Sequence, residues 1–185
     1  MAVLIWVIVI LLTLLVLIAV YYFNRFTVLA NRISNSLSQI DVQLRKRADL
    51  VPNLINTVKG YAKHEKKIMD RVTEARKALL GAKDIVGKMK AGNKLESALK
   101  SIFAIAENYP QLKANTNFLQ LQQELAAIED KVAYARQYYN DSILSYNNMV
   151  KTFPGLLFAS LYSKKEKEYL KIPEVMRAVP KVNCD

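Results

Sequence analysis

The sequence predicts an all-α protein in which a single N-terminal transmembrane helix precedes an antiparallel four-helix bundle with long helices. Three observations support this fold class. The chain opens with a long apolar run, it contains only 5 glycines and 5 prolines in 185 residues, and apolar side chains recur at steps of three and four. This spacing places the apolar side chains on one face of a helix, and long helices joined by short connections bury such faces by packing side by side.

The first predicted domain is a membrane anchor formed by residues 1–23. Thr13 is the only side chain in residues 2–23 that is neither apolar nor aromatic, and about 20 apolar residues suffice to cross a hydrocarbon core ~30 Å thick. A secretory signal peptide would have a basic start, a shorter apolar core and a cleavage site with small residues, all of which are missing. We therefore expect the lipid bilayer to surround residues 2–23.

The basic residues near the anchor predict its orientation. Arg25 and Arg32 follow the apolar run and no basic side chain precedes it, so the positive-inside rule places the C-terminal bundle in the cytoplasm and the short N-terminus outside the cell membrane. Cys184 is the single cysteine and can form no internal disulfide, which is compatible with a cytosolic location.

The second predicted domain, residues 24–162, is the helical bundle. Pro52 lies inside the apolar stripe of its first helix, where it either kinks or breaks that helix, and the unchanged phase of the stripe beyond Pro52 favours a kink. A break at Pro52 or near His64 would bring the number of bundle helices to four. The stripe consists of Ile33, Leu37, Ile40, Leu44, Ala48, Val51, Ile55, Val58 and Ala62.

Composition and apolar spacing also predict the elements that follow the first bundle helix. Residues 81–93 hold three of the five glycines and three lysines and are predicted to be a flexible connection. A helix is expected over residues 94–108, and another of about 35 residues runs from Phe118 to Val150, where ten apolar or aromatic positions keep step. Residues 163–185 form the third predicted domain, a charged and poorly ordered tail.

Two long motifs resemble the LemA family. The first, QIDVQLRKRADLVPNLINTVKGYAKHE, covers residues 39–65; the second, ENYPQLKANTNFLQLQQELAAIEDKVAYARQYYNDSILSYNNMVKTFPG, covers residues 107–155. The resemblance is specific because both motifs occur in order and at the family's spacing. It implies a single-pass membrane protein of bacteria or archaea with a cytoplasmic helical bundle. It implies no reaction and supplies no catalytic residue.

The first motif contains candidate contact residues. Arg45, Arg47 and Asn53 fall within three helical turns, so they could form a polar surface for an anionic group, or a solvated helix face whose charges pair locally. His64 is the only histidine and has no cysteine within reach, so we expect no zinc site. No Ser or Cys is arranged with it for nucleophilic catalysis, and we expect neither a metal nor a cofactor.

The second motif is rich in tyrosine and asparagine, which are common at protein contact surfaces. Tyr139 and Tyr146 lie in the apolar stripe and are expected in the core. Tyr134 and Tyr138 lie one turn apart on another face and are the better candidates for a partner surface. The remaining polar members of this set are Asn108, Tyr109, Gln111, Asn115, Asn117, Asn140, Asn147 and Asn148.

Charge is unevenly distributed along the chain. Residues 24–100 carry 17 basic and 7 acidic side chains, a net charge of +10, whereas residues 101–162 carry 4 and 5. Next to a bilayer, such a segment could meet anionic lipid headgroups, including through Arg25 and Arg32. Nucleic acid is a weaker alternative, because no recognition motif is present and the aromatic residues are concentrated in the neutral segment.

Together these observations predict a membrane-anchored structural or protein-interaction module without catalytic activity. Its partner would be an unidentified membrane or cytoplasmic protein, and a homo-oligomer is also compatible with the regular stripes. The alternative is an enzyme, or an accessory subunit of a membrane-bound complex, with an unrecognised site. Against it stands the lack of paired carboxylates at an interpretable spacing, of a phosphate-binding loop and of a metal cluster in the sequence.

Overall fold

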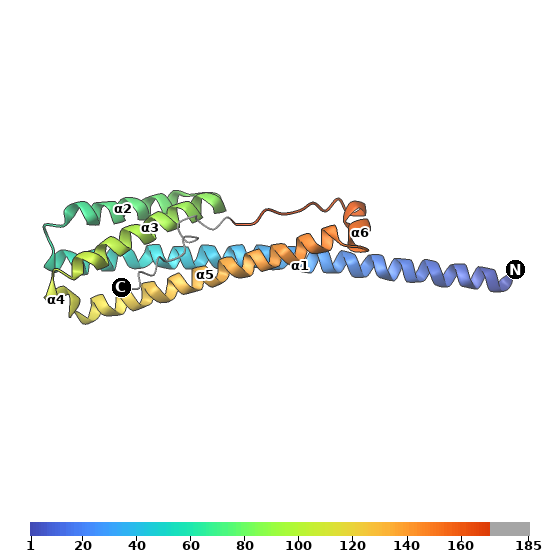
Figure 1. The fold of residues 1–185 in the computed structure, drawn as a ribbon, viewed down its shortest axis with the longest axis horizontal. Coiled ribbons are helices and arrows are strands. Elements are labelled where there is room, and N and C mark those ends of the chain that lie inside the picture. The colour runs from blue at the N-terminus through green and yellow to red at the C-terminus, as the bar shows by residue number, and fades with distance from the viewer. Residues whose placement is uncertain (171–185) are drawn as a thin grey trace, which may run out of the picture. The chain divides into compact units, whose positions relative to one another are not determined.

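A computed structural model describes residues 1–170 of the chain, and this part contains helices and no strand. The two largest helices are α1 (Ala2–Tyr61) and α5 (Thr116–Lys151), and the prediction of an all-α fold is confirmed (Figure 1). The remaining helices are α2 (Lys66–Gly81), α3 (Ile85–Ala106), α4 (Pro110–Lys113) and α6 (Gly155–Leu161).

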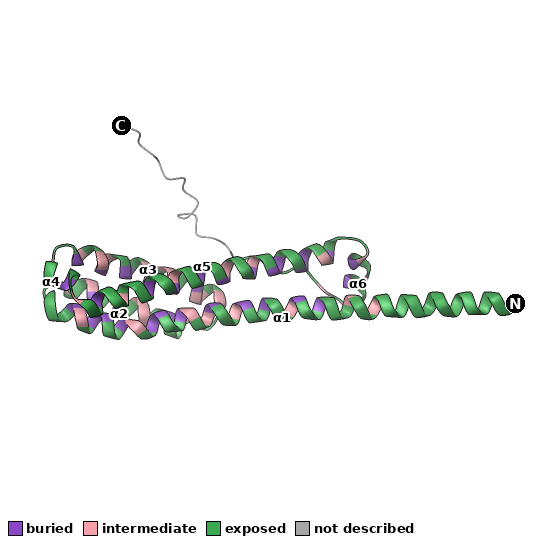
Figure 2. Ribbon diagram, turned by 90° about the horizontal axis from the view of Figure 1, so that it is seen from below, coloured by how far each residue is buried: buried purple, intermediate pink, exposed green. Residues whose placement is uncertain are grey.

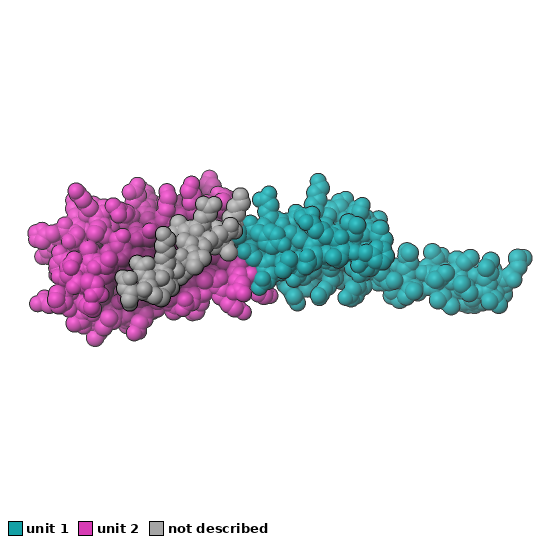
Figure 3. All heavy atoms as spheres, viewed as in Figure 1, with its two compact units in different colours: residues 1–33, 139–185 teal, residues 34–138 magenta. Residues whose placement is uncertain are grey.

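The chain divides into two compact units (Figure 3). We call residues 34–138 the bundle unit. Residues 1–33, together with residues 139–170, form the anchor unit. Both α1 and α5 contribute one part to each unit.

The bundle unit contains residues 34–61 of α1, then α2 and α3, and residues 116–138 of α5, which lie side by side (Figure 1). The connections between α1, α2 and α3 are turns of only three or four residues, so consecutive helices run antiparallel. The predicted apolar stripes form the core. Its fully or almost fully buried side chains include Ile40, Leu44, Val51, Leu54, Val58, Val72, Leu95, Ile102, Leu112, Phe118 and Val132.

Pro52 lies within α1, which continues through it to Tyr61. A break of the helix at this proline is therefore excluded. The break comes instead at residues 62–65, where the Glu65 amide donates to the carbonyl of Ala62 at 3.1 Å before α2 begins. His64 lies in this turn and is exposed.

The prediction of a flexible connection over residues 81–93 is wrong for most of its length. Helix α3 begins at Ile85, directly after the N-cap Asp84, whose carboxylate accepts a hydrogen bond from the Gly87 amide at 3.0 Å. Gly92 is buried inside the helix, and a Cβ added there would lie 2.8 Å from Cδ2 of Leu44. This glycine therefore allows α3 to approach α1 closely and does not mark a loop.

In the anchor unit, the first part of α1 is exposed along its whole circumference (Figure 2). α1 contains a stretch apolar enough and long enough to cross a membrane, none of it buried inside the protein. Beyond this stretch, Phe26 packs edge-on against Tyr146 of α5, with ring centroids 5.8 Å apart. Tyr139 and Tyr146 are buried, as the apolar stripe predicts.

The predicted poorly ordered tail is partly corrected. Residues 163–170 have no regular secondary structure, yet the main chain at Lys167 and Leu170 is hydrogen-bonded to side chains of α5. The rest of the predicted tail, with Cys184, lies outside the described residues.

Candidate functional site

Arg47 does not lie on the polar surface that its sequence neighbourhood predicts. Its side chain is only 1% exposed, whereas Arg45 is exposed and pairs with Asp49 one turn later at 3.5 Å. Asn53 is also exposed. The first motif therefore contributes one arginine to the core of the bundle unit and leaves the others on its surface, so these residues do not form a single anion site.

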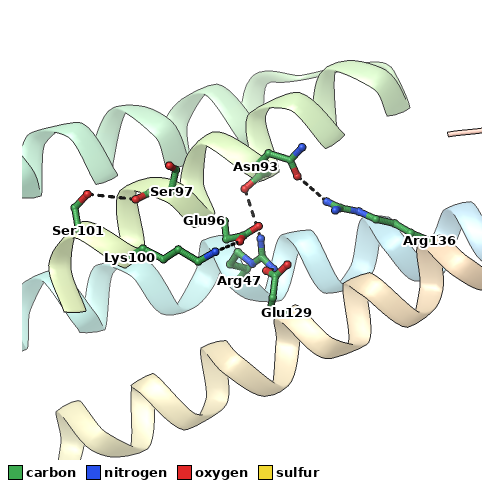
Figure 4. Close-up of polar contacts among 9 residues, drawn as sticks. Arg47, Asn93, Glu96, Ser97, Lys100, Ser101, Glu129 and Arg136 are labelled. Carbon is green, nitrogen blue, oxygen red and sulfur yellow. Dashed lines mark hydrogen bonds and ion pairs between the residues drawn. The ribbon is translucent and has the colours of Figure 1, made fainter. Parts of the chain in front are cut away.

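Arg47 belongs to a set of polar side chains that we call the charge cluster (Figure 4). Its guanidinium donates through Nη2 to Glu129 of α5 and through Nη1 to the carbonyl oxygen of Gly92 at 3.5 Å. The charge cluster thus joins α1, α3 and α5. Its side chains are Arg47, Asn93, Glu96, Lys100, Glu129 and Arg136.

Two further contacts complete the charge cluster. Lys100 Nζ lies 2.6 Å from Glu96 Oε1 within α3, and Arg136 Nη2 of α5 donates to Asn93 Oδ1 at 2.9 Å. A buried arginine is stable only when its charge and its N–H groups are matched. Here Glu129 supplies the charge and the carbonyl of Gly92 supplies a second acceptor.

The two carboxyl groups of the charge cluster titrate differently. Burial raises the pKa of Glu129 above its ordinary value of 4.5, with Arg47 opposing the shift. Burial also acts to raise the pKa of Glu96, but its hydrogen bond and ion pair with Lys100 outweigh burial, and the pKa is lowered. The two carboxyl groups interact with one another, so a proton is held more readily on Glu129.

These carboxyl groups form a pair that no spacing in the sequence indicates. Glu96 and Glu129 meet beside a cavity of about 290 Å³, whose apolar wall includes Leu99, Phe103 and Leu125. Among the described residues, no group of three or more His, Cys, Asp or Glu side chains could hold a metal ion. Because Arg47 and Lys100 neutralise both carboxylates, the arrangement is suited to fixing the register of three helices.

A second feature of the bundle unit is a groove of about 330 Å³ between α1 and α5, which we call the α1–α5 groove. Tyr134, one of the two predicted partner-contact residues, lines it and is 70% exposed. Gln43 lines it as well, and its buried Oε1 atom has no hydrogen-bond partner among residues 1–170. The other lining residues are Gln39, Asp130, Lys131 and Ala135.

The remaining predicted contact residues do not converge on this groove. Tyr138 lies one turn beyond Tyr134 on α5 and is 38% exposed. Arg25 and Arg32 are exposed and belong to the anchor unit. Sequence reasoning missed Gln43, because nothing in its own neighbourhood shows that an acceptor atom will be buried without a donor.

Asn140 and Asn147 form the best-defined polar contacts of the anchor unit. The Asn147 amide accepts from the Lys167 N–H and donates to the Lys167 carbonyl, both at 2.9 Å. Asn140 holds Leu170 in the same way, at 3.0 and 3.3 Å. The sequence indicated asparagines suited to contacts, and the structure shows that these two bind the chain's own main chain.

Comparison with known proteins supports the resemblance seen in the two motifs. The family model described as "LemA family" matches residues 36–184. The chain belongs to the LemA family. The match spans every helix of the bundle unit, including the whole charge cluster and the α1–α5 groove.

Three curated relatives are similar to this LemA-family chain. Protein LemA of Metamycoplasma hominis is 25% identical over 124 residues, which are 66% of this chain and 57% of the relative. Magnetosome protein MamQ of Magnetospirillum gryphiswaldense and Magnetosome protein MamQ 2 of Paramagnetospirillum magneticum are each 22% identical over 173 residues, 80% of this chain and 64% of the relative. The chain therefore spans less than two thirds of the length of these relatives.

Proposed function

We propose that this LemA-family protein is a membrane-anchored structural and interaction module without catalytic activity, which binds a segment of another protein in the α1–α5 groove. The observation that carries the proposal is the pairing of exposed Tyr134 with the unpartnered Oε1 atom of Gln43 in one groove. The family membership and the apolar start of α1 support a protein held at a membrane.

The anchor determines where the module acts. In this proposal residues 2–23 cross the cell membrane, the short N-terminus lies outside, and the bundle unit lies in the cytoplasm. Arg25 and Arg32 support this orientation, because both are exposed and follow the apolar stretch, and the positive-inside rule assigns such residues to the cytoplasmic side.

The chemistry of the groove favours a protein partner. A buried acceptor without a donor costs about 1–3 kcal/mol, which a partner's N–H group would recover. An exposed tyrosine ring provides a large contact area at small entropic cost. Asp130 and Lys131 lie beside these groups and offer one charge of each sign to the same segment. Together these side chains match a polypeptide better than the uniformly anionic backbone of a nucleic acid.

Binding of nucleic acid is also disfavoured because three basic side chains of residues 24–100 make contacts within the bundle unit. Arg76 Nε donates to the carbonyl of Ala48 at 2.7 Å, Lys88 pairs with Asp41 at 2.6 Å, and Arg47 is in the charge cluster.

A second candidate is an enzyme that uses Glu129 as a general acid, since burial raises the pKa of this carboxyl group beside a cavity. It ranks below the first because Arg47 donates to the carboxylate of Glu129. Glu129→Gln removes the countercharge of Arg47 and should lower the stability of the bundle unit, and such an enzyme would in addition lose its biological activity per folded molecule. The interaction module would keep its activity in this variant.

Site-specific photocrosslinking in the native membrane tests the proposal. A photoreactive amino acid replaces Gln39 in the groove or, as the matched control, Val86 of α3, which is 67% exposed in the same unit. We expect a discrete adduct with one other protein from position 39 and none from position 86. The adduct should weaken when Tyr134→Ala is added.

Two outcomes would contradict the proposal. Equal labelling from both positions would show that the groove binds no particular segment. An adduct made only of two copies of this chain would show that the groove is a homo-oligomer interface and does not dock another protein.

A further inference from the structure

Helix α6 rests against the end of the apolar stretch of α1. The Tyr162 hydroxyl donates to the carbonyl oxygen of Ala19 at 2.8 Å. The ring of Phe158 stacks on Tyr22 with centroids 4.8 Å apart, and the ring of Tyr162 meets Phe23 edge-on at 5.4 Å. These three contacts fix α6 beside residues 19–23, all within the anchor unit.

α6 buries small residues and exposes its leucines, which is the reverse of the burial pattern of a surface helix in a soluble protein. Its small residues, Gly155 and Ala159, are buried, and a Cβ added to Gly155 would collide with the carbonyl oxygen of Met149. Its three leucines point outward, whereas Phe158 packs on Tyr22. Leu156, Leu157 and Leu161 are exposed, and the preceding Phe153 is 81% exposed. Water would be a poor solvent for such a patch.

The length of α1 indicates the depth of this patch. Residues 2–18 form about 26 Å of helix at 1.5 Å per residue, so Ala19 falls near the edge of a hydrocarbon core ~30 Å thick. Side chains that contact residues 19–23 therefore lie at the boundary between acyl chains and headgroups. Tyrosine is enriched at this boundary, where its ring and hydroxyl meet both environments, and Tyr22 and Tyr162 fit this pattern.

The chain that follows α6 suits the same boundary. Lys164 and Lys165 follow α6 after two residues. The Lys164 amide donates to the carbonyl of Ala159 at 2.8 Å, which turns the chain back. Basic residues next to inserted apolar side chains attract anionic headgroups. The two hydrogen bonds between the Asn147 side chain and the Lys167 main chain, which we call the Asn147 clasp, then fix the returning chain to α5.

We propose that α6 and Phe153 form a second membrane contact, in which Leu156, Leu157, Leu161 and Phe153 insert into the interfacial layer of the bilayer beside the transmembrane helix. The occupant of this apolar face is the acyl-chain and headgroup boundary of the lipid. The inference rests on the membrane anchor of the proposed function and is independent of the partner in the α1–α5 groove.

Depth-dependent fluorescence quenching tests the inference. Full-length protein carrying Cys184→Ser is labelled with an environment-sensitive fluorophore at Leu157→Cys and reconstituted into vesicles of phosphatidylcholine and phosphatidylglycerol. The vesicles contain lipids with a nitroxide either near the headgroup or near the end of the acyl chain. Matched labels at Ile10→Cys and Val86→Cys report the mid-span of α1 and an exposed apolar site of the bundle unit.

We expect the label at position 157 to emit at shorter wavelength than the label at 86 and to be quenched more by the shallow nitroxide than by the deep one. The label at position 10 should show the reverse order, and the label at 86 should be quenched by neither. Labelling at Leu161→Cys repeats the measurement, so that the result does not depend on one substitution.

The outcomes separate the inference from the proposed function. If position 10 is quenched and positions 157 and 161 behave like 86, α6 does not contact lipid and the inference is overturned. If 157 and 161 are shielded from both nitroxides and from aqueous iodide, a protein covers α6 and the inference is equally overturned. If position 10 itself escapes quenching, the membrane anchor fails, and the proposed function fails with it.

Discussion

The bundle unit and the anchor unit use different polar chemistry to fix their parts. In the bundle unit, charged side chains from three helices meet in the charge cluster, where Arg47 is almost completely buried. In the anchor unit, the neutral amides of Asn140 and Asn147 bind the main chain of a non-helical segment. The first device depends on matched charges and on pH, whereas the second depends on geometry alone.

The two kinds of contact should therefore respond differently to substitution. Removing one member of a buried ion pair leaves an uncompensated charge and destabilises the whole unit. Removing a neutral amide leaves unpaired main-chain groups that water can reach, so the effect remains local. Substitutions in the two units should show this contrast.

The largest effect is expected for Arg47→Met. Loss of the guanidinium leaves Glu96 and Glu129 facing one another without it, and we expect the free energy of unfolding to fall by about 3–5 kcal/mol. Urea unfolding of the full-length chain in detergent, followed by circular dichroism, measures this change. The control Arg45→Met removes an exposed pair and should change stability by less than about 0.5 kcal/mol. Equal effects of the two substitutions would show that burial of Arg47 has no energetic consequence.

The next effect concerns two glycines within helices. Gly92→Ala places a Cβ 2.8 Å from Leu44, whose side chain is buried and cannot move away freely, so overpacking of about 1–3 kcal/mol should exceed the gain in helix propensity. Gly60→Ala meets no atom within 4 Å and should stabilise α1 by a few tenths of a kcal/mol. The same unfolding assay measures both changes, and a stabilising Gly92→Ala would contradict the close approach of α3 to α1.

A smaller and local effect is expected for Asn147→Ala. This substitution removes both hydrogen bonds to Lys167, so trypsin should cleave after Lys164, Lys165 or Lys167 faster than in the parent chain, while the unfolding midpoint of the bundle unit changes little. The control Asn148→Ala alters the neighbouring exposed residue and should leave the cleavage rate unchanged. A parent-like cleavage rate in Asn147→Ala would show that the amide does not hold the segment.

The smallest effect is a difference in pH dependence. The pKa of Glu129 is raised in the folded state above 4.5, so as the pH falls the folded chain binds this proton before the unfolded chain does. The free energy of unfolding should therefore rise as the pH falls from the raised pKa towards 4.5. Below 4.5 the lowered pKa of Glu96 acts in the opposite sense, and its stabilising contribution is lost. Glu129→Gln should abolish the rise but keep the loss, whereas Glu124→Gln, at an exposed position of the same helix, should keep both.

The sequence predicted the helices better than the contacts between them. The stripe from Ile40 to Val58 and the buried Tyr146 follow from periodicity, since an apolar face must be covered by something. The charge cluster does not follow from periodicity, because Arg47 and Glu129 are 82 positions apart and local spacing cannot pair them. Composition alone likewise places Gly92 in a loop. Only the position of Leu44 on the opposite helix shows why a glycine belongs there.

The candidate site shows the same limit. Tyr134 could be proposed as a partner-contact residue because it lies on a helix face outside the apolar stripe, and its exposure agrees with that expectation. Gln43 could not be proposed, because an unmet hydrogen-bonding group is a property of the folded surroundings.

The two asparagine clasps on residues 163–170 have a consequence for how this segment can move. Asn140 and Asn147 are seven positions apart on a helix, about 10.5 Å, while Lys167 and Leu170 are three positions apart in an extended chain, about 10 Å. Because these two distances match, both pairs of hydrogen bonds form in the same alignment of the segment on α5. A shift of the segment by a single residue would break both pairs. The segment can therefore be attached or detached, but it cannot slide, and its release would be a two-state event.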